Sequence, residues 1–207
     1  MVVRTVLYDL DGVIVDSKDG NRELFYTVAG YHGLRQPTAQ EVDSVFHLTF
    51  VEGLMKLFNL SEEEAVRMAN ADHKGFERGL PLMRIYPNLQ TILSGLYQKY
   101  FLGIVTGRGV TTYKVLDHFG LSKYFDVIVD CTRYQKPKPD PESLLLAIRI
   151  LGVSPDQTVY VGDSDVDVEA ASTAGAIPVH IGDNDSSGAR YNIRKLDELE
   201  PLLTGLD

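Results

Sequence analysis

Five short apolar runs recur along the chain, and each one ends at a polar or glycine-containing turn. They occupy residues 2–9, 101–106, 127–129, 158–162 and 177–181. Such runs are typical of parallel strands that are buried on both faces of a sheet. Helical patterns, such as those at residues 110–119 and 141–151, alternate with them. This alternation predicts an α/β fold with a doubly wound, Rossmann-like parallel sheet.

Residues 18–80 interrupt the alternation, because strand patterns stop there and helix signals replace them. Three capping boxes mark expected helix starts: Thr38 with Glu41, Thr49 with Glu52, and Ser61 with Glu64. We therefore expect an α-helical bundle, residues 18–80, inserted as a cap domain into a catalytic core. The core would consist of residues 1–17 and 81–207.

Composition limits the classes of function. The net charge of −9 argues against a nucleic-acid groove, which needs Lys and Arg to neutralise phosphates. A small phosphorylated substrate would need a cation to help hold it. The single cysteine, Cys131, suits a reducing compartment, and no signal peptide or membrane span is apparent, so we expect a cytoplasmic protein with no membrane partner.

Asp9 and Asp11 stand one residue apart at the end of the first apolar run. In extended backbone both carboxylates leave on the same side, and Gly12 then allows a sharp turn. Two carboxylates this close repel each other unless a cation or a shared proton intervenes. The segment is therefore a candidate site, although a polar turn with a helix-capping aspartate would have the same sequence.

A second acidic group, Asp163, Asp165 and Asp167, follows the apolar run at residues 158–162. Asp163 and Asp167 are four residues apart, so they share one face of a helix. Clustered carboxylate oxygens suit Mg²⁺, which takes a few carboxylates and keeps positions for water and phosphate. Capping of a helix N-terminus is the alternative explanation.

Two further segments could bind an anion. Thr106 and Gly107 lie where an expected strand turns into a helix, a place that offers a hydroxyl and free backbone amides. Lys136 stands in a stretch stiffened by two prolines, Pro137 and Pro139, so it could hold a phosphate at little ordering cost. A solvated basic turn is the alternative, and it is the more common setting for a lone lysine.

Taken together, these segments resemble the signatures of the haloacid dehalogenase-like superfamily, in the branch with a helical cap inserted after the first strand. The four signatures correspond here to residues 9–12, Thr106, Lys136 in the segment 136–140, and residues 162–167. Each signature alone is weak, but four in the correct order are specific. The resemblance covers nearly the whole chain.

The resemblance implies a role for each matching residue. Asp9 would attack phosphorus and become an aspartyl phosphate, and Asp11 would protonate the leaving oxygen and then activate water. Thr106 and the Gly107 amide would bind phosphoryl oxygens, and Lys136 would offset negative charge. Mg²⁺ would be held by Asp9, the Asp11 carbonyl and Asp163, with Asp167 acting through water or orienting a neighbour.

The resemblance also implies an activity. We expect a phosphatase acting on a small phosphomonoester, such as phosphoglycolate or a sugar phosphate. A β-phosphoglucomutase-type phosphomutase is an alternative, and so is a pyrophosphatase or nucleotidase of the same superfamily. Phosphoryl transfer is favoured over dehalogenation because the family's dehalogenases lack the second acid, which is Asp11 here.

In this branch the cap selects the leaving group. The matching candidates are Asn21, Arg22, His47 and Thr49, although ordinary helix-end roles would explain several of them. The expected partner is a small phosphorylated metabolite rather than a nucleic acid or a membrane. The protein would be a monomer or a homodimer.

Overall fold

The structure is a computed structural model that describes residues 2–46, 48–71 and 73–206. The chain divides into two compact units. The first, which we call the sheet unit, comprises Met1–Ile14 and Ile85–Asp207. The second, the helical unit, is Val15–Arg84, and the predicted cap, residues 18–80, lies within it.

Six parallel strands form the sheet in the order β5-β4-β1-β6-β7-β8. Their bounds are β1 (Thr5–Tyr8), β4 (Phe101–Val105), β5 (Val127–Val129), β6 (Thr158–Gly162), β7 (Ile177–Ile181) and β8 (Tyr191–Ile193). The predicted doubly wound α/β class is confirmed. All five apolar runs form strands, and β8 is an additional edge strand that the sequence analysis did not predict.

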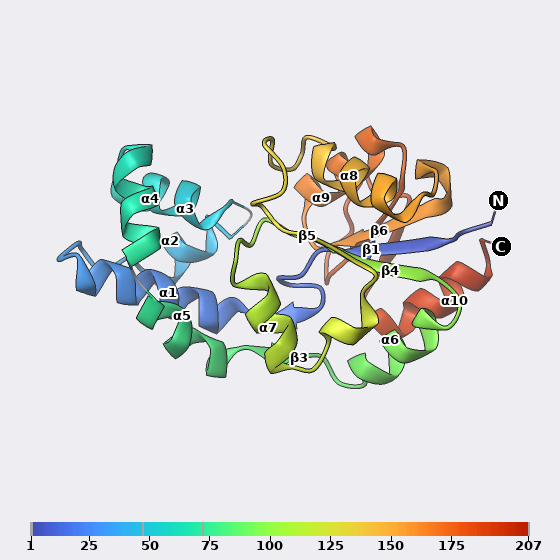
Figure 1. The fold of residues 1–207 in the computed structure, drawn as a ribbon, viewed down its shortest axis with the longest axis horizontal. Helices are drawn as coiled ribbons and strands as arrows, with labels where there is room; N and C mark the ends of the chain where they lie inside the picture. The colour runs from blue at the N-terminus through green and yellow to red at the C-terminus, as the bar shows by residue number, and fades with distance from the viewer. Residues whose placement is uncertain (1, 47, 72, 207) are drawn as a thin grey trace. The chain divides into compact units, whose positions relative to one another are not determined.

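Helices cover both faces of the sheet, with α8 and α9 on one side and α6 and α10 on the other (Figure 1). The α-helices of this unit are α6 (Leu89–Tyr97), α7 (Thr112–His118), α8 (Glu142–Leu151), α9 (Asp165–Ala174) and α10 (Leu199–Thr204). Short 3₁₀ turns are η2 (Ser122–Tyr124), η3 (Pro155–Gln157) and η4 (Leu196–Glu198). Leu7 of β1 is fully buried in a core with Leu144 of α8 and Ala171 of α9. This double cover explains why the strands are apolar throughout.

The strand order determines where the site forms. From β1 the chain goes to β4 and β5 on one side of the sheet, and then returns to β6, β7 and β8 on the other side. The direction of winding therefore reverses at β1, and ligands of such sheets bind at the carboxyl ends of the strands beside that point. Segments that follow β5, β4, β1 and β6 consequently meet at one edge.

The helical unit has its own hydrophobic core, which includes Phe25, Val42, Leu54 and Ala65. Its helices are α1 (Lys18–Tyr31), α2 (Ala39–Asp43), α3 (Phe50–Phe58), α4 (Glu62–Ala71), α5 (His73–Gly79) and the 3₁₀ turn η1 (Leu80–Leu82). A separate two-stranded sheet pairs β2 (Val15–Asp16) with β3 (Arg84–Ile85). A bundle of helices is thus confirmed for this part of the chain.

All three predicted capping boxes are present. The Thr38 hydroxyl accepts from the Glu41 N–H at 3.2 Å, and the Glu41 carboxylate accepts from the Thr38 N–H at 2.7 Å. Thr49 with Glu52 and Ser61 with Glu64 form the same reciprocal pairs. Each pair satisfies two backbone N–H groups that a helix start would leave unpaired.

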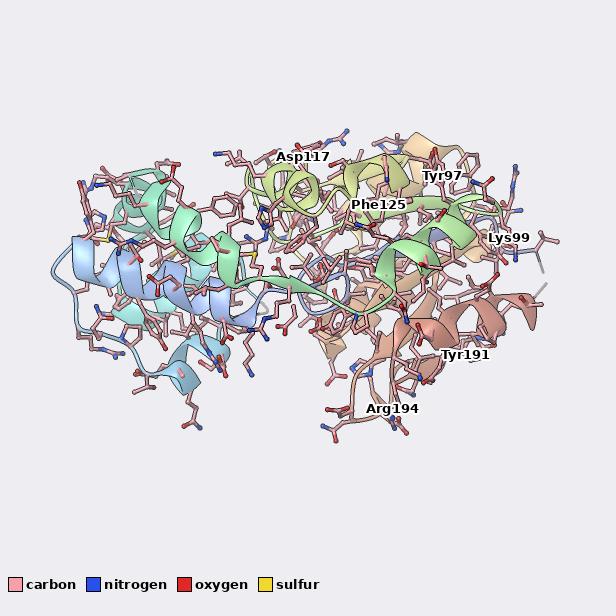
Figure 2. All side chains as sticks on the ribbon, turned by 90° about the horizontal axis from the view of Figure 1, so that it is seen from below. Tyr97, Lys99, Asp117, Phe125, Tyr191 and Arg194 are labelled. Atoms are coloured by element: carbon pink, nitrogen blue, oxygen red, sulfur yellow. The ribbon has the colours of Figure 1, made fainter. Side chains whose placement is uncertain are left out.

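Outward-facing side chains of the sheet unit are rich in charge (Figure 2). Lys99, just after α6, donates to Glu200 of α10 at 2.6 Å, and Arg194 forms an ion pair with Asp185 at 2.7 Å.

Across the described ranges, no helix combines the length and apolar character that would be needed to cross a lipid bilayer.

Helices α1 and α5 touch backbone to backbone. A Cβ atom on Gly20 would lie 2.6 Å from the Gly79 carbonyl oxygen, and one on Gly79 would lie 2.4 Å from the Gly20 oxygen. Such distances are far below van der Waals contact, so both positions exclude a side chain. The crossing of these two helices therefore depends on both glycines.

We predict that Gly20→Ala destabilises the protein by about 1–3 kcal/mol, because the new methyl group must push α1 from α5. Gly30→Ala, in the same helix, is the matched control, since its Cβ would meet only the Gln36 amide at 3.5 Å. That change should be neutral or stabilising by up to about 1 kcal/mol. Urea unfolding of both variants measures the difference, and equal stability would contradict the packing argument.

Candidate functional site

Residues that follow adjacent strands gather at the carboxyl edge of the sheet. Asp9 directly follows β1, Thr106 follows β4, and Asp163 follows β6. The hydrogen bonds of the sheet extend to Asp9 and Thr106. The Asp9 N–H donates to the Val161 carbonyl at 2.9 Å, and the Thr106 N–H donates to the Val129 carbonyl at 3.0 Å. Their backbone positions are thus set by the sheet rather than by a free loop.

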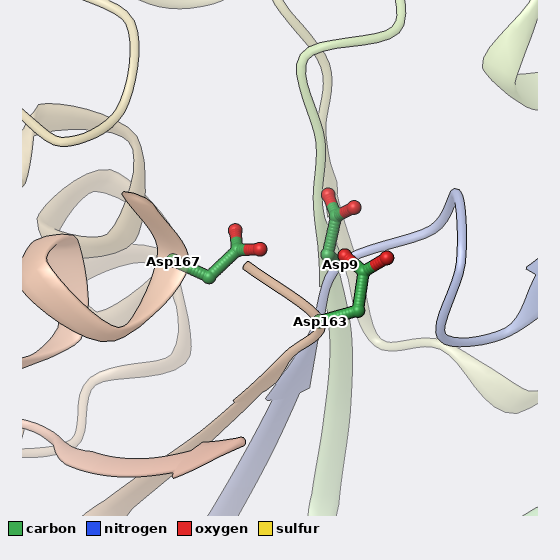
Figure 3. A group of neighbouring side chains, drawn as sticks. All are labelled: Asp9, Asp163 and Asp167. Carbon is green, nitrogen blue, oxygen red and sulfur yellow. The ribbon is translucent and has the colours of Figure 1, made fainter. Parts of the chain in front are cut away.

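Three carboxylates converge at this edge (Figure 3). Asp9, Asp163 and Asp167 each offer one oxygen, and these oxygens lie within 4.8 Å of one another. Asp167 is in the first turn of α9, whose N-cap is Ser164, so the helix start brings its side chain toward Asp9. The structure therefore brings together both acidic segments that the sequence analysis singled out.

Gly12 makes this close approach sterically feasible. Its φ angle is +86°, and a Cβ atom there would lie 2.0 Å from Asp163 Oδ2. The turn is fixed from the other side by the Tyr86 hydroxyl, which donates to the Gly12 carbonyl at 2.9 Å. A side chain at position 12 would displace Asp163 and strain the backbone as well.

The lysine of the site is Lys138. Its ammonium donates to Asp9 Oδ1 at 3.0 Å, to Asp167 Oδ1 at 2.5 Å and to the Tyr160 hydroxyl at 2.9 Å. An ammonium has three donors, and these three acceptors use all of them. Lys138 is therefore the cation that binds the buried carboxylates.

The prediction that Lys136 provides this cation is wrong. Its side chain is 72% exposed and pairs with Asp140 at 3.7 Å. The cause lies in the loop, where the Glu142 carboxylate accepts from the backbone N–H groups of Gln135 and Lys136 at 3.0 Å each. These two bonds fix the loop beside α8, and Lys138, two residues after Lys136, is the lysine that reaches the carboxylates.

Tyr160 is a second residue that the sequence analysis missed. Its hydroxyl is buried beneath the cluster and lies 3.1 Å from the Val105 carbonyl and 3.2 Å from Asp167 Oδ1. It thereby connects the lysine, the helix carboxylate and the backbone of β4. The tyrosine stands inside an apolar strand run, where the sequence gives no sign of a polar role.

Burial and mutual repulsion keep two of the carboxyl groups from ionising readily. Burial raises the pKa of Asp9 to about 8; the Lys138 ammonium opposes the shift, and the charges of Asp167, Asp163 and Asp11 add to it. Burial also raises the pKa of Asp163 to about 7, and the Asp167 charge contributes. Protons thus occupy part of this cluster at neutral pH.

Asp167 and Lys138 behave as an ion pair instead. Burial would raise the pKa of Asp167, but the Lys138 ammonium and the hydrogen bonds from Lys138, Ser164 and Tyr160 outweigh it and leave the pKa below its usual value. Burial lowers the pKa of Lys138, whereas the Asp167 and Asp9 charges raise it well above normal. The pair therefore carries its charges throughout the neutral range.

The donor set fits a hard divalent cation. Such ions prefer carboxylate oxygens, and a bound cation would offset the burial and the carboxylate repulsion that together raise the pKa values of Asp9 and Asp163. Asp167 Oδ1 already accepts from Lys138, and Asp167 Oδ2 accepts from the Ser164 hydroxyl at 2.6 Å. Asp9 and Asp163 are accordingly the better placed ligands, with Asp167 orienting the group around them.

Thr106 and Gly107 follow β4, the strand beside β1, at this same edge. The Thr106 side chain is buried, and its hydroxyl oxygen accepts from the Arg108 N–H at 3.1 Å. The hydroxyl hydrogen therefore remains available for another acceptor. Space is open around Gly107, since a Cβ there would meet nothing within 4 Å. A hydroxyl and an accessible backbone turn together suit an anion.

Arg108 is the third residue that the sequence analysis gave no role. Its guanidinium holds both carboxylate oxygens of Asp11, with Nε 3.0 Å from Oδ2 and Nη2 2.5 Å from Oδ1. Arg108 therefore binds both oxygens of Asp11, which stands two residues after Asp9 in the sequence. The signal was its position two residues after Thr106, at a strand end.

The predicted cap residues occupy structural positions in the helical unit. Thr49 caps α3, the Asn21 amide donates to Ser17 at 3.2 Å, and Arg22 makes two bonds to Asp43 at 2.8 and 2.6 Å. His47 lies outside the described residues. Substrate contact by this set stays a prediction.

Comparison with known proteins agrees with the geometry. Residues 6–180 match the family described as haloacid dehalogenase-like hydrolase. A phosphoglycolate phosphatase from Aquifex aeolicus is 31% identical over 179 residues, which are 84% of this chain and 82% of the relative. A fructose-1-phosphate phosphatase from Escherichia coli is 26% identical over 188 residues, or 85% and 95% of the two chains.

A solved structure is similar over nearly the whole length. It is a HAD-superfamily hydrolase, subfamily IA, variant 1, from Geobacter sulfurreducens. The TM-score is 0.82 at 28% identity, with 97% of this chain and 100% of the other covered. The two units and the sheet edge described above thus belong to a recurrent architecture.

We predict that divalent cation binding strengthens as pH rises from 6 to 8, because the cation displaces protons from Asp9 and Asp163. The affinity should rise by roughly tenfold per pH unit for each proton displaced. Without a cation, a raised pKa means that the folded state binds protons more tightly than the unfolded state, so stability falls as pH rises through 7 and 8.

Thermal unfolding at several pH values, with and without Mg²⁺, measures both effects. The Mg²⁺-induced increase in Tm should be larger at pH 8 than at pH 6. Asp163→Asn is the control, since it removes one titrating ligand and should reduce the increase at every pH. A Tm increase that is the same at pH 6 and pH 8 would contradict the assignment.

Proposed function

The chain belongs to the haloacid dehalogenase-like hydrolase family, and on that basis we propose that it is a Mg²⁺-dependent phosphatase acting on a small phosphomonoester through a phosphorylated Asp9. The observation that carries the proposal is the arrangement around Asp9. Its carboxylate accepts from the Lys138 ammonium at 3.0 Å and lies close to the carboxylates of Asp163 and Asp167. One nucleophilic oxygen thus stands among groups suited to phosphate and cation.

Asp9 would attack phosphorus with one carboxylate oxygen. The bond from oxygen to phosphorus forms as the bond from phosphorus to the leaving oxygen breaks. Asp11 gives its proton to that leaving oxygen, so the alcohol departs neutral. In the second step Asp11 takes a proton from water, the water oxygen attacks phosphorus, and Asp9 is released together with inorganic phosphate. Two displacements replace one that is more difficult.

The remaining groups stabilise charge and orientation. The Thr106 hydroxyl and the Gly107 N–H would donate to phosphoryl oxygens, and Lys138 would offset the charge that Asp9 and phosphate share. Mg²⁺ would be held by Asp9, Asp163 and the Asp11 carbonyl, with Asp167 orienting the groups around them. When bound, it neutralises phosphate charge and keeps the Asp9 carboxyl ionised.

The substrate class is supported by the relatives and the composition. The similar proteins described above are named for phosphoglycolate and fructose 1-phosphate, both small phosphomonoesters. A chain with net charge −9 holds such an anion through a local group of cations rather than through its overall field. A cytoplasmic setting is supported by the single cysteine, Cys131.

We expect Asp9→Asn to lower phosphate release by at least about 10³-fold, because an amide does not form the phosphoenzyme. Phosphorylated metabolites supplemented with Mg²⁺ are assayed for inorganic phosphate, with the Asp9→Asn protein as the blank. Substrate loss without equal phosphate release would indicate a phosphomutase. Full activity in Asp9→Asn would exclude the mechanism.

The two lysines give a matched pair of variants. Lys138→Met should lower kcat/KM by at least about 100-fold, because it removes the ammonium from a buried, charged site. Lys136→Met removes an exposed charge in the same loop and should change kcat/KM by less than about twofold. Circular dichroism establishes that both variants are folded. The reverse order of effects would restore Lys136 as the catalytic lysine.

A further inference from the structure

Tyr160 is a buried tyrosine whose hydroxyl meets the ammonium of the site. It stands in the middle of β6, is 1% exposed, and packs in the same core as Leu7 of β1. Its single hydroxyl hydrogen has two acceptors within reach, the Val105 carbonyl at 3.1 Å and Asp167 Oδ1 at 3.2 Å. The oxygen itself therefore accepts from Lys138, whose Nζ atom lies 2.9 Å away.

The three acceptors of the Lys138 ammonium differ in what the proposed reaction does to them. Asp9 changes from a carboxylate into an acyl phosphate, so its remaining oxygen loses the charge that makes it a strong acceptor. Asp167 keeps its charge, and its other oxygen accepts from the Ser164 hydroxyl at 2.6 Å. Tyr160 is neutral throughout and is held by the packing of an interior strand. Two acceptors thus stay in place on the ammonium when the third weakens.

We propose that Tyr160 is a positioning residue: its hydroxyl, together with Asp167, holds the Lys138 ammonium so that the N–H released by Asp9 turns to a phosphoryl oxygen. This inference rests on the proposed phosphatase mechanism. Without the hydroxyl, only Asp167 would hold the ammonium once Asp9 carries phosphate, and the flexible lysine stem would let the charge move. A charge stabilises a transition state best when it is fixed in place beforehand.

A second buried tyrosine, on the neighbouring strand, provides a matched control. Tyr8 of β1 is 0% exposed and pairs in register with Val161, the residue after Tyr160. Among the described residues, the Tyr8 hydroxyl has no hydrogen-bond partner. Tyr8→Phe and Tyr160→Phe therefore remove the same atom from equally buried rings, and only the second change removes a contact to Lys138.

Turnover of p-nitrophenyl phosphate with Mg²⁺ measures the effect on the reaction. For Tyr160→Phe we expect kcat to fall by about 10- to 100-fold, because a hydrogen bond to a charged group is lost where charge develops. KM should change by less than about threefold, since the turn at Thr106 and Gly107 still holds the phosphate. Tyr8→Phe should match the wild type within about twofold. Circular dichroism establishes that both variants are folded.

A double-mutant cycle determines whether Tyr160 acts through the lysine. In the Lys138→Met background, Tyr160→Phe should lower kcat by less than about twofold, because the ammonium that it positions is gone. Calorimetry with beryllofluoride and Mg²⁺, which imitate a phosphoryl group on Asp9, repeats the cycle without turnover. Tyr160→Phe should weaken this binding by at least about tenfold when Lys138 is present and by less than about twofold in Lys138→Met.

Several outcomes would overturn the inference. An equal effect of Tyr160→Phe in both backgrounds would make the tyrosine a structural residue, or one that acts through Asp167 alone. A rise in KM with unchanged kcat would assign it to substrate binding instead of positioning. Wild-type protein that neither releases phosphate nor binds beryllofluoride would refute the proposed function itself, whereas an active wild type with Tyr160→Phe equal to Tyr8→Phe would refute only the positioning role.

Discussion

The ammonium of Lys138 is the interaction on which the rest of the site depends. It is enclosed by two carboxylates and a phenol, each within hydrogen-bonding distance. Burying charges is costly unless they are paired and fully hydrogen-bonded, and here each donor of the ammonium has an acceptor. The network connects a loop after β5, a strand end, a helix start and the middle of β6. Removing the lysine would leave at least one buried carboxylate without its counter-charge.

The fold could be predicted because the sequence repeats its signals. Each core strand is a separate apolar run, and each capping box satisfies local groups, so the prediction needed no long-range information. β8, by contrast, is three residues long with Asn192 at its centre, and it carries no apolar run to announce it. It pairs at the sheet edge through β7, a tertiary circumstance that local patterns do not encode.

The acidic residues of the site could be located for a similar reason, since parallel strands place their carboxyl ends at one edge. The cations could not be located in this way. Lys136 and Lys138 are two residues apart between prolines, and the choice between them is made by Glu142, which anchors the first from a following helix. Arg108 takes its role from Asp11, which lies 97 residues earlier in the chain. Tyr160 takes its role from Lys138, which lies 22 residues earlier. Only the three-dimensional structure supplies those partners.

The contact between Gly12 and Asp163 has a consequence for how this protein can evolve. Gly12 has no side chain, and the carboxylate of Asp163 occupies the space that a side chain would need. The two positions therefore constrain each other although they are far apart in the sequence. Mutational drift at position 12 has no gradual route, because even a methyl group collides with the carboxylate. A lineage that loses this glycine must also change the position of Asp163. A library for directed evolution should therefore keep both codons fixed.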